Sequence, residues 1–238
     1  MKSEFLKFRS LPTPRYSGLF LLAAVALGTF IVYKNGSFDS SAFQAAISLP
    51  SMIVALILGA WIVGVEYGQN TLRQVLSSDP SRSRLVVSKV IVLLVVLTVA
   101  VVVLFVLAYL LFSLVSESTM NYRDFQGTLV VTIIDNAIYA TIGLAFGFIA
   151  KSMAGAVTLS LVFFFVIDGF FTLIPKIGQY SIGKAIAAFN TSIYSDFDLF
   201  SGYSEKQDSL EKAGLIILVW LVILLGLGAL RFLKPDIK

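Results

Sequence analysis

The stretch VIVLLVVLTVAVVVLFVLAYLLFSL occupies residues 90–114 and contains no charged side chain. An α-helix needs about 20 predominantly apolar residues to cross the hydrocarbon core of a bilayer, and this stretch is longer than that. A strand of a membrane β-barrel would alternate apolar and polar residues over about 10 positions. Residues 91–103 are instead almost unbroken apolar sequence. The stretch therefore predicts a membrane-spanning α-helix.

Five further segments share this apolar character. With the first they predict six spans, at residues 16–33, 43–64, 86–114, 128–150, 154–174 and 212–233. The composition agrees: 58% of residues are hydrophobic, 13% are charged, and the mean hydropathy is +0.90. Soluble domains have about 45–50% apolar and about 25% charged residues. We therefore expect an all-α polytopic membrane protein, with residues 1–238 forming a single transmembrane domain.

The distribution of Lys and Arg predicts the orientation, because loops on the cytoplasmic side carry an excess of these residues. With six spans, the side that holds both termini carries twelve of the 18 Lys and Arg residues, and the other side carries six. The second side also carries eight carboxylates. We therefore expect both termini in the cytoplasm, a cytoplasmic loop over residues 65–85 and an extracellular loop over residues 175–211.

The chain has no Cys and no His. Zinc sites, thiol nucleophiles and Ser-His-Asp triads all need one of these side chains. We therefore expect no catalytic group and no metal or cofactor bound by this chain, and an intramembrane enzyme is disfavoured.

The first fifteen residues, MKSEFLKFRSLPTPR, have the pattern of a short amphipathic helix. Phe5, Phe8 and Leu11 recur near a helical period, and Pro12 and Pro14 are expected to stop the helix. Such a pattern is typical of a helix that lies in the membrane interface. The alternative is a basic tail that only sets orientation. The residues assigned to the interfacial helix are Glu4, Phe5, Lys7 and Phe8.

The segment VEYGQNTLRQVLSSDPSRSRLVVSK, residues 65–89, joins the second predicted span to the third and is too polar to lie in lipid. Residues 71–76 predict a short helix that is apolar on one side. A polar loop with a small apolar helical face suits docking onto a soluble partner. The alternative is a connector whose Arg residues only follow the charge bias between the two sides.

This segment resembles the loop between the second and third spans of ABC-2-type transporter permeases. Those permeases show a Glu, a Gly-Thr pair, a Leu-rich short helix, a Pro, a Ser/Thr-Arg pair and a Lys that opens the next span. Asn70 stands where the family usually has Gly, a mild departure because Asn also tolerates left-handed backbone conformations. The resemblance covers the whole chain in architecture and the loop in motif. The matching residues are Glu66, Thr71, Leu72, Leu76, Pro80, Ser81, Arg82 and Lys89.

The resemblance implies that residues 65–85 form a coupling loop, which sits in a cleft of a separate ATP-binding subunit. The resemblance also implies two such subunits, which would bind ATP and Mg²⁺. This chain contains no G-x-x-x-x-G-K-[ST] phosphate loop, so it cannot hydrolyse ATP by that route itself. Two permease chains would form the pathway, as a homodimer or with a second permease. We expect a transport subunit, not an enzyme, that contacts membrane lipid and no nucleic acid and lies in a bacterial cell membrane.

These expectations favour the permease subunit of an ATP-driven exporter of an amphipathic compound, such as an antibiotic, a peptide or a lipid. The direction of transport comes from the family, and no residue selects the substrate. The alternative is a secondary transporter or channel driven by an ion gradient. Many secondary transporters contain internal repeats, and the sequence shows none.

Two carboxylates fall within predicted spans, Asp135 in the fourth and Asp168 in the fifth. At 1.5 Å per helical residue, each lies roughly 9–11 Å below the outer edge of its span. A charge at mid-membrane depth costs about 2.5–3.5 kcal/mol on insertion scales. Asp135, Asn136 and Asp168 are therefore candidates for the translocation path. The alternative is that the carboxylates hydrogen-bond to neighbours such as Asn136 or extend toward the outer surface.

Gly143 and Gly147 form a small-xxx-small pair in the fourth predicted span. Such pairs let another helix approach closely. We expect tight packing within the chain rather than a contact between two copies.

Overall fold

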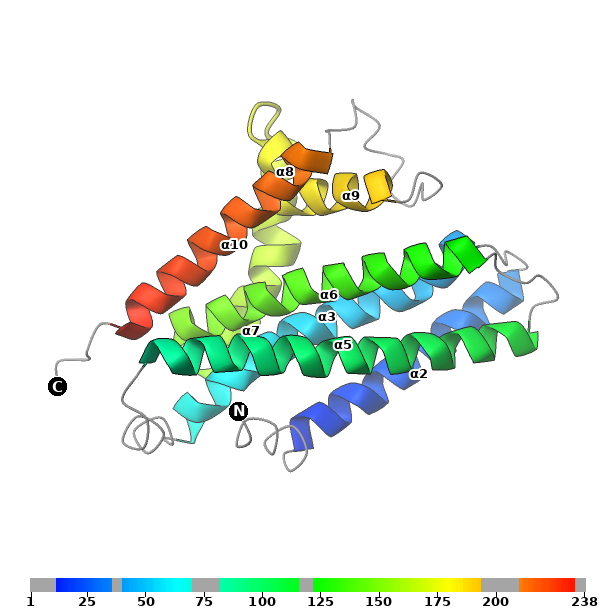
Figure 1. Cartoon of the computed structure of the whole chain (residues 1–238), viewed down its shortest axis with the longest axis horizontal. Helices are drawn as coiled ribbons and strands as arrows, with labels where there is room; N and C mark the ends of the chain where they lie inside the picture. The colour runs from blue at the N-terminus through cyan, green and yellow to red at the C-terminus, as the bar shows by residue number, and fades with distance from the viewer. Residues whose placement is uncertain (1–11, 36–39, 70–81, 116–121, 194–209, 234–238) are drawn as a thin grey trace.

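The computed structural model describes residues 12–35, 40–69, 82–115, 122–193 and 210–233 (Figure 1). Within these ranges the secondary structure is helical and contains no strand. The elements, numbered as in Figure 1, are α2 (Pro12–Asn35), α3 (Ser40–Gly68), α5 (Arg82–Val115), α6 (Tyr122–Ala150), α7 (Met153–Val162), the π-helix η1 (Phe163–Ile167), α8 (Asp168–Leu173), the 3-10 helix η2 (Gly178–Tyr180), α9 (Ile182–Ile193) and α10 (Leu210–Leu233).

Six of these helical stretches are long and apolar enough to cross a membrane, which confirms the predicted fold class. The candidate spans are Pro12–Ile31, Ala46–Gly68, Arg84–Leu111, Phe125–Ala150, Met153–Leu173 and Glu211–Phe232. The fifth consists of α7, η1 and α8 in succession. Residues 175–193, the first half of the predicted outer loop, include η2 and α9.

The helices form two groups that differ in direction (Figure 1). α2, α3, α5 and α6 lie side by side along the long axis of the molecule. α7 and α8 rise from this group toward α9, and α10 descends from α9 to pack on α6. The main core lies between α3, α6 and the helices that cover them, with Trp61, Leu93 and Phe148 fully buried.

α3 and α6 approach each other closely through glycines. A Cβ atom on Gly59 would overlap the carbonyl oxygen of Ala140, and one on Gly143 would overlap that of Leu56. A Cβ on Gly147 would likewise lie 2.8 Å from the Cβ of Val63. The small-xxx-small pair therefore packs against α3 of the same chain, as predicted.

The fifth candidate span is not one continuous α-helix. The π-helical stretch Phe163–Ile167 separates α7 from α8, and the amide of Asp168 donates to the carbonyl oxygen of Phe163, five residues back. Such stretches are rare and occur often at functional sites. A π turn holds more residues than an α turn. The side chains of α8 therefore point in a different direction from the one that an uninterrupted α-helix would give them.

A two-residue turn connects α6 to α7. Lys151 has a φ of 53°, in the left-handed region that L-residues seldom adopt. Ser152 is the N-cap of α7, and its Oγ accepts a 3.1 Å hydrogen bond from the amide of Gly155. The cap satisfies one of the free amides of the first helical turn. The chain therefore turns from α6 into α7 with only two connecting residues.

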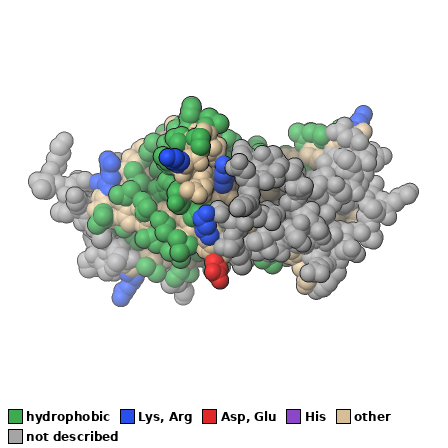
Figure 2. All heavy atoms as spheres, turned by 90° about the horizontal axis from the view of Figure 1, so that it is seen from above, with side chains coloured by type: hydrophobic (Ala, Val, Ile, Leu, Met, Phe, Trp, Pro, Cys, Tyr) green, Lys and Arg blue, Asp and Glu red, His purple; other side chains and the backbone are tan. Residues whose placement is uncertain are grey.

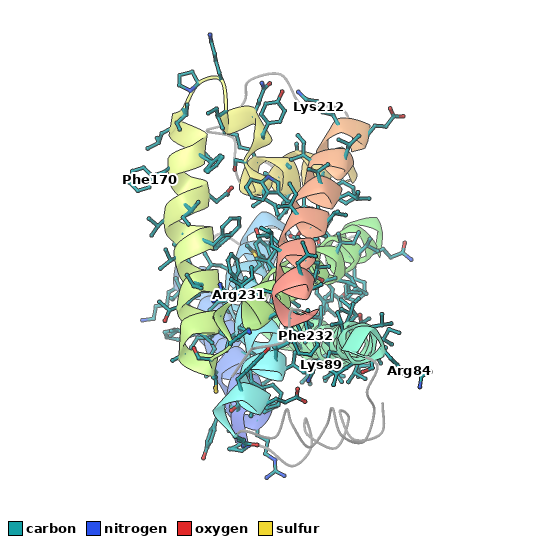
Figure 3. The ribbon with its side chains drawn as sticks, turned by 90° about the vertical axis from the view of Figure 1, so that its left-hand side faces the viewer. Arg84, Lys89, Phe170, Lys212, Arg231 and Phe232 are labelled. Carbon is teal, nitrogen blue, oxygen red and sulfur yellow. The ribbon has the colours of Figure 1, made fainter. Side chains whose placement is uncertain are left out.

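The outer surface of the described helices is largely apolar. Seen from above, hydrophobic side chains cover much of the described surface, with few charged side chains among them (Figure 2). Phe170 on α8 points away from the other helices, while Lys212 and Arg231 lie near opposite ends of α10 (Figure 3). An apolar surface of this extent suits contact with lipid.

The predicted interfacial helix lies outside the described residues, and so do Glu4, Phe5, Lys7 and Phe8. Pro12 and Pro14, which we expected to stop that helix, belong to the first turn of α2. Proline is tolerated there because the first amides of a helix have no intrahelical acceptor. The first candidate span thus begins at Pro12, four residues earlier than predicted.

Candidate functional site

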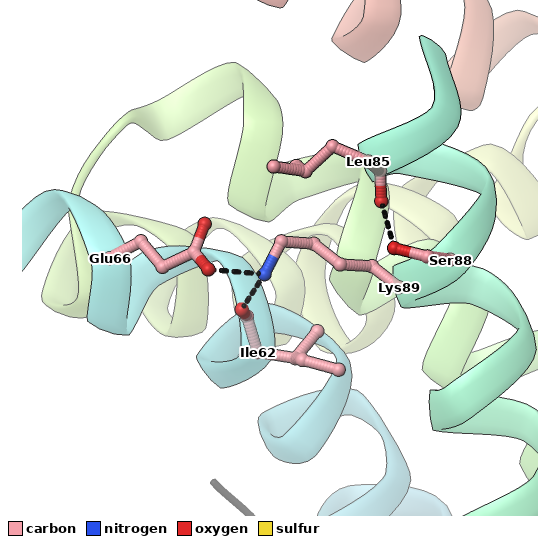
Figure 4. Close-up of polar contacts among 5 residues, drawn as sticks. All are labelled: Ile62, Glu66, Leu85, Ser88 and Lys89. Carbon is pink, nitrogen blue, oxygen red and sulfur yellow. Dashed lines mark hydrogen bonds and ion pairs between the residues drawn. The ribbon is translucent and has the colours of Figure 1, made fainter. Parts of the chain in front are cut away.

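A buried ion pair joins α3 to α5 at the ends that flank residues 70–81. The Nζ of Lys89 lies 2.8 Å from Oε1 of Glu66, and the two side chains are 0% and 2% exposed. The same Nζ donates a 2.9 Å hydrogen bond to the carbonyl oxygen of Ile62 (Figure 4). Lys89 therefore binds two oxygen atoms of α3 at once.

The local sequence explains this arrangement. Ile62 and Glu66 are four residues apart, so they lie on one face of α3. Lys89 is four residues from both Leu85 and Leu93, which are buried on the core face of α5. A lysine on this face carries its charge into the core, where a charge needs a partner. Glu66 supplies that partner.

The energetics make this pair a strong link. Removing one partner of a buried ion pair typically costs about 3–5 kcal/mol, because the remaining charge is left uncompensated. If α3 and α5 separated at this end, both charges would lose their partner while still surrounded by apolar side chains. The two helices that lead into and out of residues 70–81 are therefore held together where that segment begins and ends.

Asp168, the first residue of α8, caps the N-terminus of α9. Its Oδ1 accepts hydrogen bonds from the Ser181 hydroxyl and the Ile182 amide, both at 2.9 Å. Its Oδ2 accepts from the Gly183 amide at 3.0 Å. The Lys184 amide donates to the Ser181 hydroxyl at 3.3 Å. The first amides of a helix lack intrahelical partners and favour a negative group, so this cap accounts for the burial of Asp168.

Asp135 on α6 contacts α9 nearer its other end. The Nδ2 of Asn190 lies 2.9 Å from Oδ2 and 3.1 Å from Oδ1 of Asp135. Both carboxyl oxygens are thus paired with one neutral amide. Asp135 is 5% exposed, and no Lys or Arg among the described residues pairs with it.

α10 also contacts the region around α9. The Nε1 of Trp220 donates a 2.8 Å hydrogen bond to the carbonyl oxygen of Tyr180 in η2. The indole packs edge-on against Phe163 and Phe171, with ring centroids 5.6 Å and 6.0 Å away. α9 and the turn before it are therefore tied to α6, α8 and α10.

Asn136 joins α6 to α3. Its Nδ2 donates to the Ser51 hydroxyl at 3.1 Å and to the carbonyl oxygen of Thr132 at 2.7 Å. The sequence analysis named Asn136 as a hydrogen-bond partner for the carboxylates within the spans. In the structure its amide donates to Ser51 and Thr132 instead. Hydrogen bonds between membrane helices contribute about 0.6 kcal/mol on average, so this one adds little to the close glycine packing of the same two helices.

Comparison with known proteins now identifies the family. The sequence profile described as ABC-2 family transporter protein matches residues 22–237. The chain belongs to the ABC-2 transporter family. None of the curated proteins matches it. The resemblance inferred from the loop after the second span is thereby confirmed.

Membership in the ABC-2 family establishes the chain as a multi-pass membrane permease, a transport subunit without an ATPase domain. In this family ATP binding lies on a separate subunit, and permeases generally pair with such subunits. Among the described residues of the ABC-2 chain, no three His, Cys, Asp or Glu side chains come together as a metal site would require.

Only some of the predicted coupling residues can be placed in the ABC-2 chain. Glu66 and Lys89 form the buried ion pair described above. Arg82 is the first residue of α5. Four others, Thr71, Leu72, Leu76 and Pro80, lie outside the described residues.

Sequence reasoning missed the partners of the two in-span carboxylates. Asn190 is the informative case, because a signal was present. Ile182, Ile186 and Asn190 follow one another at four-residue intervals, so Asn190 continues the apolar stripe of α9. A polar residue on the apolar face of an amphipathic helix indicates that a polar partner lies opposite it. In this chain the partner of Asn190 is Asp135.

Proposed function

We propose that this chain is the membrane-spanning subunit of an ATP-driven exporter of amphipathic compounds, and that the ion pair between Glu66 and Lys89 passes movement of the ATP-binding subunit to the spans. The observation that carries the proposal is the position of this pair. It lies, fully buried, where α3 and α5 flank residues 70–81. A force on that segment would move both helices together.

The packing supports a route from the segment into the bundle. α3 contacts α6 through Gly59 and Gly143, so backbone meets backbone with no flexible side chain between them. α10 approaches α6 in a similar way, because a Cβ on Gly228 would lie 3.0 Å from the carbonyl oxygen of Ala145. A shift of α3 would therefore reach α6 and α10 directly.

The assembly that we propose contains two ATP-binding subunits, which hold ATP and Mg²⁺, and two permease chains, with a homodimer as the expected form. Residues 65–85 face the cytoplasm and dock into the ATP-binding subunit through Thr71, Leu72, Leu76, Pro80 and Arg82. Residues 1–11, which precede the first candidate span, flank this dock at the interface of a bacterial cell membrane. The charge bias of the loops supports this orientation.

The proposal is tested by reconstituting the permease with its ATP-binding subunit in vesicles. The variants Glu66→Gln and Lys89→Met should lower transport per ATP hydrolysed at least tenfold while the ATP-binding subunit still co-purifies. Glu211→Gln and Lys212→Met serve as controls, because both residues are exposed at the start of α10. Unchanged coupling in the Glu66 and Lys89 variants would contradict the proposed role of the pair.

The same vesicles distinguish an ATP-driven exporter from the alternative, a secondary transporter or channel driven by an ion gradient. An ATP-driven exporter should fail without the ATP-binding subunit and should continue when an ionophore dissipates ion gradients. Transport that persists without that subunit and stops with the ionophore would overturn the proposal.

A further inference from the structure

A groove of about 320 Å³ lies between α6, α9 and α10. Its walls include Ile134 and Ile138 of α6, Phe189 of α9, and Leu218, Leu221 and Val222 of α10. The other lining residues are also apolar or glycine. The volume falls at the lower end of the range for small-molecule sites, which is roughly 300–1,000 Å³. The groove can therefore accept a short hydrocarbon or aromatic body.

A polar contact lies beside this apolar groove. Asp135 follows Ile134 in α6, and Asn190 follows Phe189 in α9, so each partner is the sequence neighbour of a lining residue. Asn190 donates its amide to both carboxyl oxygens of Asp135. The contact therefore joins α6 to α9 one residue away from the groove lining on each helix, and neither of its side chains forms part of the groove wall itself.

The contact compensates the buried groups poorly. The Oδ1 of Asn190 is buried and has no hydrogen-bond partner among the described residues. Asp135, for its part, has a neutral amide where a buried carboxylate is best paired with a cation. A protonated amine carries a positive charge and up to three N–H donors, so it would be the better partner.

We propose that this groove binds the substrate and that the substrate class is amphipathic amines, with the apolar body between α6 and α10 and the ammonium group at Asp135. Charge complementarity with Asp135 argues for a cation over a neutral or an anionic compound. The ammonium group displaces the amide of Asn190. Binding thus releases the end of α9 that Asp135 holds, while Asp168 still caps the other end. This inference rests on the proposed export function and names the substrate class.

Equilibrium binding to the permease in nanodiscs tests the inference without ATP or the partner subunit. The probe is radiolabelled dodecylamine, and unlabelled dodecylamine, dodecanol and dodecanoate compete at equal membrane concentration. We expect dodecylamine to compete at least tenfold more strongly than either other compound. Equal competition by all three would overturn the inference. Selective amine binding without any ATP-driven transport by the unmodified permease and its ATP-binding subunit would instead count against the export function alone.

Three variants localise the site. Asp135→Asn should weaken dodecylamine binding at least tenfold and leave dodecanol competition unchanged. Asn190→Ala should strengthen amine binding, because the carboxylate no longer has to release an amide. Leu221→Trp should fill the groove and weaken binding of dodecylamine and dodecanol alike. An Asp135→Asn variant that keeps full amine selectivity would overturn the inference.

Two controls address binding at a second carboxylate and occupation of the groove by a second copy of the chain. Asp168→Asn removes the buried carboxylate at the opposite end of α9 and should leave amine selectivity unchanged; an equal loss in this variant would contradict a site at Asp135. The chain has no Cys, so Leu218→Cys introduces a single one. Disulfide cross-linking of two copies through this Cys, with loss of amine binding, would show that a second copy occupies the groove and would overturn the inference.

Discussion

The carboxylate of Asp168 accepts a 3.0 Å hydrogen bond from the amide of Gly183, which lies fifteen residues later in the chain. The side chain therefore links two elements, because it belongs to α8 in the fifth candidate span and caps the N-terminus of α9. A charge that the sequence places inside a span is here the cap of a neighbouring helix.

Removing this cap should destabilise α9. Asp168→Ala leaves the amides of Ile182 and Gly183 and the Ser181 hydroxyl without their acceptor. Replacing a helix cap by Ala costs about 0.5–2 kcal/mol, and we expect a value near the top of that range because the cap is charged. Hydrogen exchange at residues 182–184 should become faster in the variant. Asp168→Asn keeps one acceptor oxygen, so its exchange rates should lie between those of the unmodified chain and those of Asp168→Ala. Unchanged exchange in Asp168→Ala would contradict the cap.

The ion pair between Glu66 and Lys89 should show strong energetic coupling. Each of Glu66→Leu and Lys89→Met leaves one buried charge uncompensated and should cost about 3–5 kcal/mol of unfolding free energy. The double variant, with no buried charge, should be far more stable than the sum of the two losses predicts. The unfolding free energies of the unmodified chain, the two single variants and the double variant, measured in mixed micelles, give the coupling energy between the two side chains. Additive losses would show that the two side chains do not interact.

The contact between α3 and α6 should tolerate no added methyl group. Gly143→Ala places a Cβ against the backbone of Leu56 and should destabilise the chain by about 3 kcal/mol, the upper end of typical overpacking losses. Gly169→Ala is the matched control, since a Cβ there meets nothing within 4 Å. It should be neutral or slightly stabilising. The melting temperatures of the two variants in detergent measure the difference, and similar values would argue against this close approach.

The orientation can be tested because the chain has no Cys. A membrane-impermeant maleimide added to intact cells should label Glu205→Cys, in the predicted outer loop. It should label Lys238→Cys only after the membrane is permeabilised. The reverse labelling pattern would show that the termini lie outside.

The spans could be predicted from the sequence, but most contacts between them could not. Each apolar run is long enough to define a span by itself, so the prediction needs no tertiary information. The run over residues 90–114 is apolar on all sides. Such a helix has no distinct polar face, so its sequence does not show which side packs on a neighbour.

The candidate site was predictable only where residues shared a motif. Glu66 and Lys89 were both found through the resemblance of their loop, although nothing in the sequence showed that they touch across α3 and α5. The depth of Asp135 in its span was predictable, but its partner Asn190 lies 55 residues away. Asn190 could have been noticed because it continues the apolar stripe of α9.

The π-helical stretch directly before Asp168 sets the direction in which its carboxylate points. Conversion of residues 163–167 to α-helix would turn Asp168 by about 100°, the rotation of one helical residue. The carboxylate would then leave the amides of α9, although no helix had unfolded. Deleting Phe165 removes the extra residue that the π stretch accommodates, so it should give a continuous α-helix that keeps Asp168 on the amides of α9. Hydrogen exchange at Ile182 and Gly183 should then be unchanged, and faster exchange there would show that the cap requires the π stretch itself.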